Sequence, residues 1–240
     1  MRVLDPAAQL QAAGFAVVPG LYAPAEVAAL LRCIEDAPAA GPSFRRSQDV
    51  FAIRNVVGEI PGLWPLLVTA KLRALLGELF PGGCHLTKAI YFDKPAQSNW
   101  LVAWHQDLMV NVDCRLNLPG FGPWTSKAGW VQVQPPVAVL ENTVTLRLHL
   151  DDCDATNGAL KVVPGSHWRG VVPADTIADY TGTATICAVP AGGAMLMKPL
   201  LLHASGRSTS ARSRRVLHLE FSTAELPAGL AWRERRAVPA

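Results

Sequence analysis

The chain has 240 residues, of which 50% are apolar and 17% charged, and its formal net charge is +3. This length suits one domain of the barrel or sandwich type, and the small net charge argues against a nucleic-acid-binding protein. No apolar run is long enough to span a membrane, and the acid and the proline within residues 1–6 interrupt any signal-peptide core. We therefore expect a cytoplasmic protein that does not contact membranes.

The five cysteines are far apart in the sequence and show no C-x-x-C spacing. They are Cys33, Cys84, Cys114, Cys153 and Cys187. Neither a structural zinc site nor a secreted disulfide framework fits this pattern, so we expect reduced thiols.

The first third of the chain is predicted to be mostly helical. Residues 14–18 read as a short strand, and apolar residues recur at helical spacing in residues 24–37 and 64–80. Pro24 suits the first turn of the first helix, and the Pro-Gly-Gly of residues 81–83 ends the second. We expect both helices to pack against a sheet.

From about residue 84 the sequence changes to short strands separated by turn residues. The predicted strands are residues 85–92, 103–105, 143–150, 160–163, 185–189, 194–197, 201–203 and 216–221. This pattern predicts a mainly β fold, a barrel or double-sheet jelly roll with packing helices. We expect a single domain, residues 1–240, in which a helical part (about 1–83) packs on a β core (about 84–222).

Two segments have no clear periodic pattern. Residues 108–139 are predicted to be irregular, and a long insertion of this kind is typical of a substrate-covering loop, with Trp124 near the substrate. The alternative is a disordered surface excursion. Residues 232–236 are predicted to form a solvated tail.

The sequence Trp-His-Gln-Asp at residues 104–107 is the strongest candidate for a functional site. His105 and Asp107 are separated by one residue, so their side chains point to the same face of an extended strand end. His203 follows an apolar run, and a buried imidazole needs a partner for its nitrogens. Two histidines and one carboxylate form the facial triad that binds non-haem Fe(II) and leaves positions open for a co-substrate and O2.

Several arginines follow His203, and strand alternation distinguishes two of them. Arg214 falls on one face with Val216 and His218, and Arg215 falls on the other. An arginine pointing into a barrel needs an anion, and a carboxylate matches its planar set of donors. Such a carboxylate is present at the far end of 2-oxoglutarate.

Taken in order, these segments resemble the phytanoyl-CoA dioxygenase family of Fe(II)/2-oxoglutarate oxygenases. The resemblance covers residues 14–22, 104–107, 157–167 and 203–206, followed by Arg214 eleven positions after His203. It implies a double-stranded β-helix, with a cupin-like jelly roll as its core. It also implies that His105, Asp107 and His203 bind iron.

The resemblance implies further roles for residues around the metal. Arg214, assisted by Ser205, would bind the distal carboxylate of 2-oxoglutarate, and Gln106 would contact the co-substrate or the substrate. Lys88, Ile90 and Phe92 share the strand face that the family turns toward its pocket. Arg147 departs from the family pattern, and together with Lys88 it favours an anionic group on the substrate.

A second H-x-D motif, His149-Leu150-Asp151, competes for the role of metal site. In the family's fold the metal motif closes the second strand and the distal histidine lies on the seventh. Residues 149–203 contain about three predicted strands, which is too few, whereas residues 105–203 have room for the rest. We therefore assign the metal to the first motif and a core position to His149.

The predicted reaction is hydroxylation of an unactivated carbon of a small molecule, with O2 consumed and succinate and CO2 released. Asp107 argues against a halogenase, in which a small residue leaves room for chloride. Two alternatives stay open: a cupin-like zinc or nickel protein that does not use 2-oxoglutarate, and a non-catalytic ligand-binding relative. Arg214 with Ser205 argues against the first, and the intact triad argues against the second.

Overall fold

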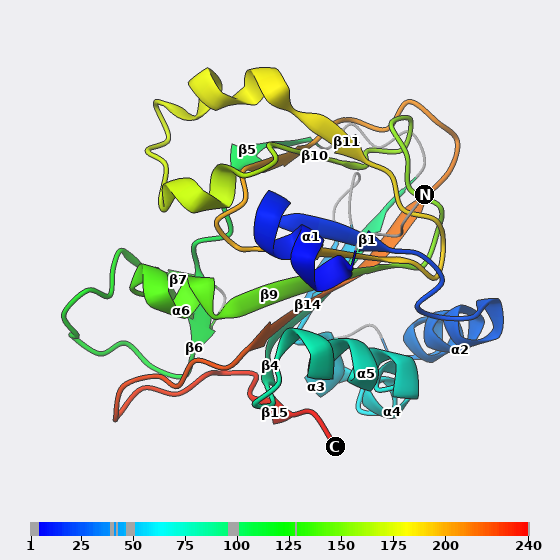
Figure 1. Cartoon of the computed structure of the whole chain (residues 1–240). Coiled ribbons are helices and arrows are strands. Elements are labelled where there is room, and N and C mark those ends of the chain that lie inside the picture. The colour runs from blue at the N-terminus through cyan, green and yellow to red at the C-terminus, as the bar shows by residue number, and fades with distance from the viewer. Residues whose placement is uncertain are drawn as a thin grey trace.

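The computed structural model of the chain describes residues 5–38, 41, 43–46, 51–95, 101–127 and 129–239. Its helices are α1 (Pro6–Ala13), α2 (Pro24–Glu35), α3 (Val56–Glu59), α4 (Leu63–Leu67), α5 (Ala70–Leu79) and α6 (Val137–Glu141), with 3-10 turns at Ser166–Arg169 and Ile177–Thr183. Its strands divide into three sheets, and two of these face each other with the candidate site between them (Figure 1).

The largest sheet has eight strands. In spatial order they are β1 (Phe15–Val18), β12 (Ala194–Met197), β9 (Thr143–His149), β14 (Arg214–Ser222), β4 (His85–Lys94), β3 (Phe51–Arg54) and β2 (Phe44–Arg46), with β15 (Arg236–Ala237) also paired to β4. The second sheet has four strands, β11 (Thr185–Cys187), β10 (Leu160–Val162), β13 (His203–Ser205) and β5 (Val102–His105). All the registered pairs in both sheets are antiparallel. The predicted jelly-roll fold is confirmed.

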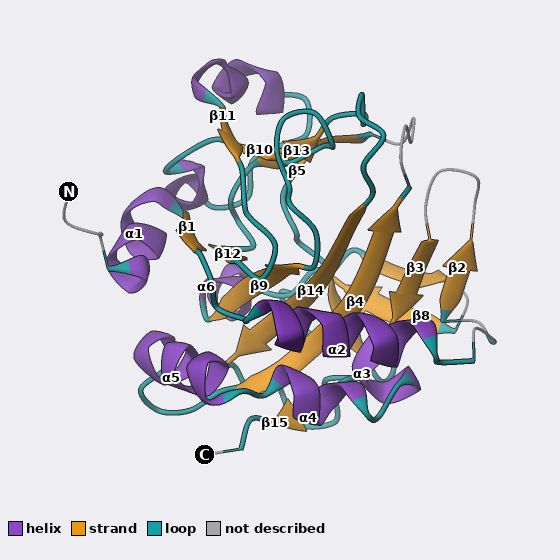
Figure 2. Ribbon diagram, turned by 90° about the vertical axis from the view of Figure 1, so that its right-hand side faces the viewer, coloured by secondary structure: helices purple, strands orange, loops and turns teal. Residues whose placement is uncertain are grey.

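The helices α2 to α5 cover the outer face of the large sheet (Figure 2). The helix α2 begins at Pro24, and the Glu26 carboxylate accepts a hydrogen bond from the backbone N–H of Ala23 at 2.7 Å. Its buried Val27 and Leu30 join the main core. Alternation along β9 and β14 contributes Leu146, Leu148, Leu217, Leu219 and Phe221 to the same core.

Several expectations for the first 83 residues were wrong. The helix predicted over residues 64–80 is two helices, because the chain leaves the helical conformation at Val68 and Thr69 starts α5 by accepting a hydrogen bond from the Leu72 N–H at 3.2 Å. The helix α1 was missed. The strands β1 to β3 belong to the same sheet as β4, so a boundary at residue 83 does not separate helical from β structure.

The segment 108–139 is also more regular than predicted. It forms a third sheet from β6 (Val110–Val112), β8 (Trp130–Val133) and β7 (Trp124–Lys127), which has an apolar cluster of its own. The predicted solvated tail was wrong as well, because Trp232 is 5% exposed and joins this cluster. The Trp232 indole N–H donates to the Ala224 carbonyl at 3.0 Å.

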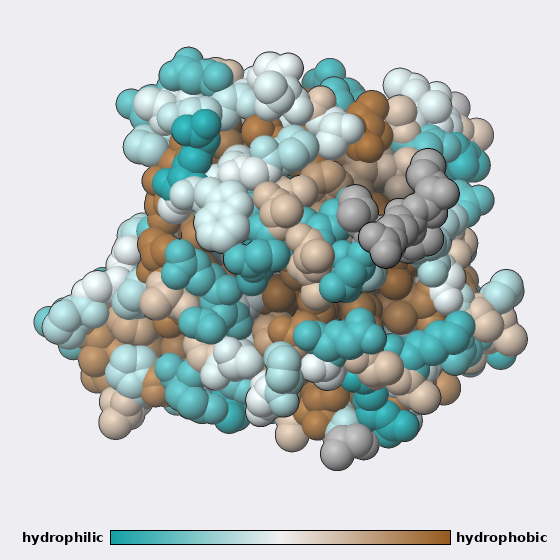
Figure 3. All heavy atoms as spheres, in the orientation of Figure 1, coloured by the Kyte–Doolittle hydropathy of each residue, from teal (hydrophilic) through white to brown (hydrophobic). Residues whose placement is uncertain are grey.

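Polar and apolar residues are interspersed over the face of the molecule in Figure 3. Among the helices of the described residues, none combines the length and the apolar character needed to cross a bilayer.

Candidate metal centre and active site

Two strands of the smaller sheet position the three predicted metal ligands. His105 ends β5 and is directly opposite His203, the first residue of β13. Asp107 follows β5, and its backbone N–H donates to the Pro199 carbonyl at 2.9 Å. The Nε2 atoms of His105 and His203 each lie 3.6 Å from a different carboxylate oxygen of Asp107. One possible ligand atom from each of the three residues lies within 4.8 Å of those of the other two.

The hydrogen bonds of both imidazoles suit a metal site. The Nδ1 of His105 lies 2.8 Å from the Ala103 carbonyl, and the Nδ1 of His203 lies 2.9 Å from the Leu201 carbonyl. When each Nδ1–H donates to the backbone, the lone pair of each Nε2 is left available to a metal ion. The Asp107 Oδ2 is buried without a hydrogen-bond partner among the described residues. This donor set fits a divalent transition metal with two imidazoles and one carboxylate.

The two histidines of the triad differ in their electrostatics: burial alone would lower the pKa of His105, but Asp107 raises it above its usual value. Burial lowers the pKa of His203 to about 4. Burial alone would raise the pKa of Asp107, but the neighbouring His203 and His105 lower it well below its usual value. A neutral imidazole beside an ionised carboxylate is the protonation state that metal coordination requires.

The triad opens into a cavity of about 260 Å³ between the two sheets. Arg214, the first residue of β14, lines this cavity and is 4% exposed. Its guanidinium donates to the Gly158 carbonyl, and its Nε is buried without a partner among the described residues. Ser205, also in the lining, donates to the same carbonyl at 3.0 Å. The structure thus brings Arg214 and Ser205 together in the same cavity as the metal ligands.

The strand β9, in the interior of the large sheet, adds two further basic side chains on the inner face. Arg147 is 7% exposed and lines the cavity, and one of its terminal nitrogens lies 2.9 Å from the His218 Nδ1. Burial and the nearby Arg214 lower the pKa of Arg147 to about 10. His149 is 2% exposed, and within the described structure neither of its ring nitrogens has a partner.

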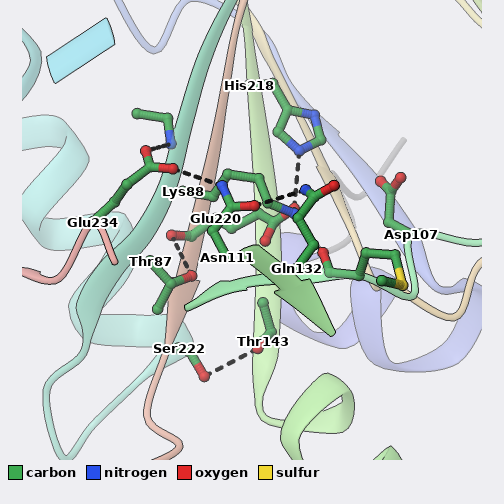
Figure 4. Close-up of polar contacts among 12 residues, drawn as sticks. Thr87, Lys88, Asp107, Asn111, Gln132, Thr143, His218, Glu220, Ser222 and Glu234 are labelled. Atoms are coloured by element: carbon green, nitrogen blue, oxygen red, sulfur yellow. Dashed lines mark hydrogen bonds and ion pairs between the residues drawn. The ribbon is translucent and has the colours of Figure 1, made fainter. Parts of the chain in front are cut away.

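Lys88 also reaches the cavity, but its charge is neutralised within the protein. Its ammonium donates to the Glu220 carboxylate at 2.7 Å and to the Met109 carbonyl at 2.8 Å (Figure 4). Burial lowers the pKa of Lys88, but Glu220 outweighs that effect and raises it. Both groups are therefore charged, and they form a buried ion pair.

The sequence comparison decides the family. A family model described as phytanoyl-CoA dioxygenase matches residues 10–216. The chain belongs to the phytanoyl-CoA dioxygenase family. Membership makes it an iron- and 2-oxoglutarate-dependent oxygenase, which agrees with the donor set described above. No curated protein sequence matches the chain.

Solved structures share the fold at low sequence identity. EctD from S. alaskensis, in its apo form, superposes with a TM-score of 0.71 at 19% identity, covering 97% of this chain and 84% of its own. AviO1 from Streptomyces viridochromogenes Tue57 gives 0.67 at 22% identity, covering 95% and 99%. HygX from Streptomyces hygroscopicus, solved with nickel, 2-oxoglutarate and hygromycin B, gives 0.65 at 16% identity, covering 92% and 87%.

Two residues that were expected near the ligands, Gln106 from the family resemblance and Trp124 from the predicted substrate-covering loop, lie outside the cavity lining. The Gln106 amide donates to the Gly170 and Leu200 carbonyls at 2.8 and 2.6 Å and accepts from the Val172 N–H at 2.8 Å. It therefore fixes the loop around the metal motif and is not part of the cavity lining. Trp124 packs against the apolar cluster of the third sheet, outside the described lining.

Other predicted residues lie where expected, and some were missed. Ile90 and Phe92 line the cavity beside Lys88. Among the described residues the competing motif is not arranged as a metal site, because both oxygens of Asp151 accept hydrogen bonds from Arg215. The lining residues that were not among the predicted site residues are Arg54, Val102, Gln132, Leu160, His218 and Glu220. Strand alternation could have identified Glu220, because it is two residues after His218 on β14 and is opposite Lys88 of β4. Gln132 could not be identified in this way, because it lies in the segment that was predicted to be irregular.

Proposed function

We propose that this chain hydroxylates an unactivated carbon of a small anionic molecule and converts 2-oxoglutarate to succinate and CO2. The observation that carries the proposal is that the His105, Asp107 and His203 triad shares one cavity with the buried guanidinium of Arg214. A zinc or nickel protein that does not use 2-oxoglutarate has no need for a buried arginine facing its metal.

The protein residues hold and orient the reactants. His105, Asp107 and His203 would hold the iron, and Arg214 would pair with the distal carboxylate of 2-oxoglutarate, next to the Ser205 hydroxyl. When bound, a ferrous ion supplies the redox chemistry that decarboxylates 2-oxoglutarate and removes hydrogen from an unactivated carbon. The two facing sheets bury His203 and Arg214, which limits the access of bulk water to this side of the site.

The charge of the cavity supports an anionic substrate. Four cations line it, namely Arg54, Lys88, Arg147 and Arg214, against the carboxylates Asp107 and Glu220. The charges of a ferrous ion and of 2-oxoglutarate cancel each other, so an excess of positive charge remains. Because Lys88 is neutralised by Glu220 and Arg214 would bind 2-oxoglutarate, Arg54 and Arg147 are left for a substrate anion. Arg147 is the stronger candidate, because it is buried whereas Arg54 is half-buried, and a buried cation needs an anionic partner more. The complex of HygX with hygromycin B supports a small molecule as the type of substrate.

The test is succinate release with Fe(II), 2-oxoglutarate and O2 over a panel of small carboxylic acids, each paired with its methyl ester. We expect at least one acid to raise succinate release by about tenfold or more and to gain one oxygen atom, whereas its ester does not. Asp107→Ala is the inactive control. If no compound raises the rate above this control, the proposed reaction is wrong. If esters are equally active, only the anionic group is wrong.

A further inference from the structure

Gln132 is a polar residue of the cavity with no role in the reaction proposed above. It is on β8, directly opposite Asn111 of β6, so both side chains project from the same face of the third sheet. Its amide nitrogen donates to the Asn111 side-chain oxygen at 2.7 Å. Its amide oxygen has no hydrogen-bond partner among the described residues. A cavity-lining acceptor without a partner is available to a ligand.

A row of buried hydrogen bonds holds Gln132 from behind. The Asn111 amide nitrogen donates to Glu234 Oε1 at 2.7 Å, and the backbone N–H of Ala89 donates to Glu234 Oε2 at 2.8 Å. Asn111 is 3% exposed and Glu234 is 7% exposed. Figure 4 shows the row leading from Glu234 through Asn111 to Gln132, toward the side on which Asp107 lies.

The chemistry of the row determines which way each amide faces. Burial raises the pKa of Glu234 to about 7, so above that pH its carboxylate is ionised and only accepts hydrogen bonds, and Asn111 must turn its NH2 group toward it. Its oxygen then faces Gln132, which must donate its own NH2 group to that oxygen. The Gln132 oxygen is consequently left toward the cavity. At pH 8, where the binding experiments are run, the orientation therefore follows from the ionised Glu234 carboxylate.

The other carboxylates of the cavity have different tasks. Glu220 Oε1 accepts from Lys88 at 2.7 Å and lies 3.2 Å from the His218 Nε2. Asp107 belongs to the metal triad. Gln132 therefore supplies a neutral acceptor on one side of the cavity, while Arg147 supplies a donor with positive charge from β9.

We propose that Gln132 is a specificity-determining residue that accepts a hydrogen bond from the substrate, with Glu234 and Asn111 as positioning residues. The inference rests on the proposed function and narrows its substrate class. The substrate is a small acid that also carries a hydroxyl or ammonium group, a hydroxy acid or an amino acid, with the acid at Arg147 and the donor at Gln132.

The first experiment measures binding without turnover. The full chain is loaded with zinc(II) and 2-oxoglutarate, and dissociation constants are measured by ligand-observed NMR. The probes are 4-hydroxypentanoate against 4-oxopentanoate and 5-hydroxypentanoate against 5-methoxypentanoate, with 4- and 5-aminopentanoate and plain pentanoate alongside. We expect a donor-bearing acid to bind about tenfold more tightly than its acceptor-only partner. Gln132→Met should make the two equal while leaving pentanoate unchanged.

The second experiment reverses the direction of the hydrogen bonds from residue 234 through Asn111 to Gln132. In Glu234→Gln the new amide must accept from the Ala89 N–H, so its NH2 group faces Asn111, and Asn111 and Gln132 both turn over. The cavity then presents an NH2 group, and we expect the preference to change to 4-oxopentanoate or 5-methoxypentanoate. The double variant Asn111→Asp with Glu234→Gln moves the carboxylate one step along the row. It should restore the original preference, which a merely structural role would not do.

Three results would overturn the inference: no probe binds, the wild type does not prefer donor-bearing acids, or the preference is the same in Glu234→Gln as in the wild type. Failure of the proposed function is distinguishable, because the zinc-loaded protein does not oxidise its ligand. The preference for donor-bearing acids could change in the variants as expected while no compound stimulates succinate release by the iron-loaded enzyme. In that case the proposed hydroxylation is wrong and the role of Gln132 stands.

Discussion

The two faces of the large sheet bury their side chains equally well but with opposite chemistry. On β9, Leu146 and Leu148 are 0% exposed and pack under the helices, whereas Arg147 and His149 are 7% and 2% exposed on the inner face. On the outer face, side chains of the protein itself fill the apolar core. The inner face keeps buried nitrogens of Arg147, His149 and Arg214 without partners among the described residues, so it is complete only with ligands.

The largest effect should come from removing a metal ligand on the inner side. Asp107→Ala leaves two imidazoles without their shared carboxylate, so we expect iron affinity and succinate release to fall by more than about 100-fold. Equilibrium iron binding and succinate assays would measure this. Removing iron from the wild type with a chelator should have the same effect on activity and be reversed by Fe(II). An active Asp107→Ala protein would contradict the assigned triad.

Arg214→Met should change co-substrate binding and stability in opposite directions. Losing the guanidinium should weaken 2-oxoglutarate binding by about 30- to 1,000-fold, because it removes one partner of a buried charged pair. Without co-substrate the variant should be as stable as the wild type or more stable, because an incompletely paired buried cation is removed. Calorimetry and urea unfolding test the two effects.

Arg215→Met is the matched control for that variant. Arg215 is the next residue on β14, but it is on the other face and bonds to Asp151 and Glu35. The Arg215→Met variant should bind 2-oxoglutarate with an affinity within about twofold of that of the wild type. Equal losses of 2-oxoglutarate affinity in Arg214→Met and Arg215→Met would contradict the assignment of co-substrate binding to the inner face.

Leu146→Ala tests the outer face. This side chain is 0% exposed in the main core, so its truncation should lower the free energy of unfolding by about 2–5 kcal/mol. The affinity of the folded protein for 2-oxoglutarate should stay unchanged, because the residue faces the helices. Urea unfolding and calorimetry below the unfolding transition measure both. A loss of affinity as large as that of Arg214→Met would contradict the comparison.

The smallest of these effects depends on pH. Burial raises the pKa of Glu234 from 4.5 to about 7, an effect that Lys88 on β4 partly offsets and Glu220 on β14 increases. The folded state therefore favours the neutral carboxyl, whose stabilising contribution is complete below pH 4.5 and is lost as the pH rises to about 7.

The isosteric Glu234→Gln variant does not titrate at this position. The unfolding free energy of the wild type minus that of the variant should thus fall by roughly 3 kcal/mol or less between pH 4.5 and pH 8. Urea unfolding at several pH values measures the difference. A constant difference across this range would contradict the raised pKa.

The sequence was most informative where local chemistry and alternation agree. The H-x-D spacing and the strand ends at His105 and His203 predicted the triad, and alternation along β14 separated Arg214 from Arg215 correctly. The strand Ala194–Met197 has the predicted bounds. These features depend on neighbours within a few residues, which one sequence can display.

The sequence was least informative where a contact joins distant segments. Gln106 resembled a ligand contact because it lies within the metal motif, but its amide bonds to loops about 64 and 94 residues away. The break between α4 and α5 depends on a threonine cap inside an apolar repeat. Residues 108–139 form short strands and a helix that pack with a C-terminal segment, and Trp232 of that segment gave no sign of burial in the sequence.

Asn157 and Gly158 form the dipeptide in which an asparagine amide is most readily attacked by the following backbone nitrogen. Here the Asn157 side chain is 0% exposed, and it accepts from the Asp154 N–H at 2.8 Å and donates to the Asp152 carbonyl at 2.7 Å. The folded chain thereby holds this amide away from cyclisation, beside the carbonyl that receives Arg214 and Ser205. Each unfolding event removes that protection. Deamidation of Asn157, at the co-substrate end of the cavity, should therefore report how often a stored sample has unfolded.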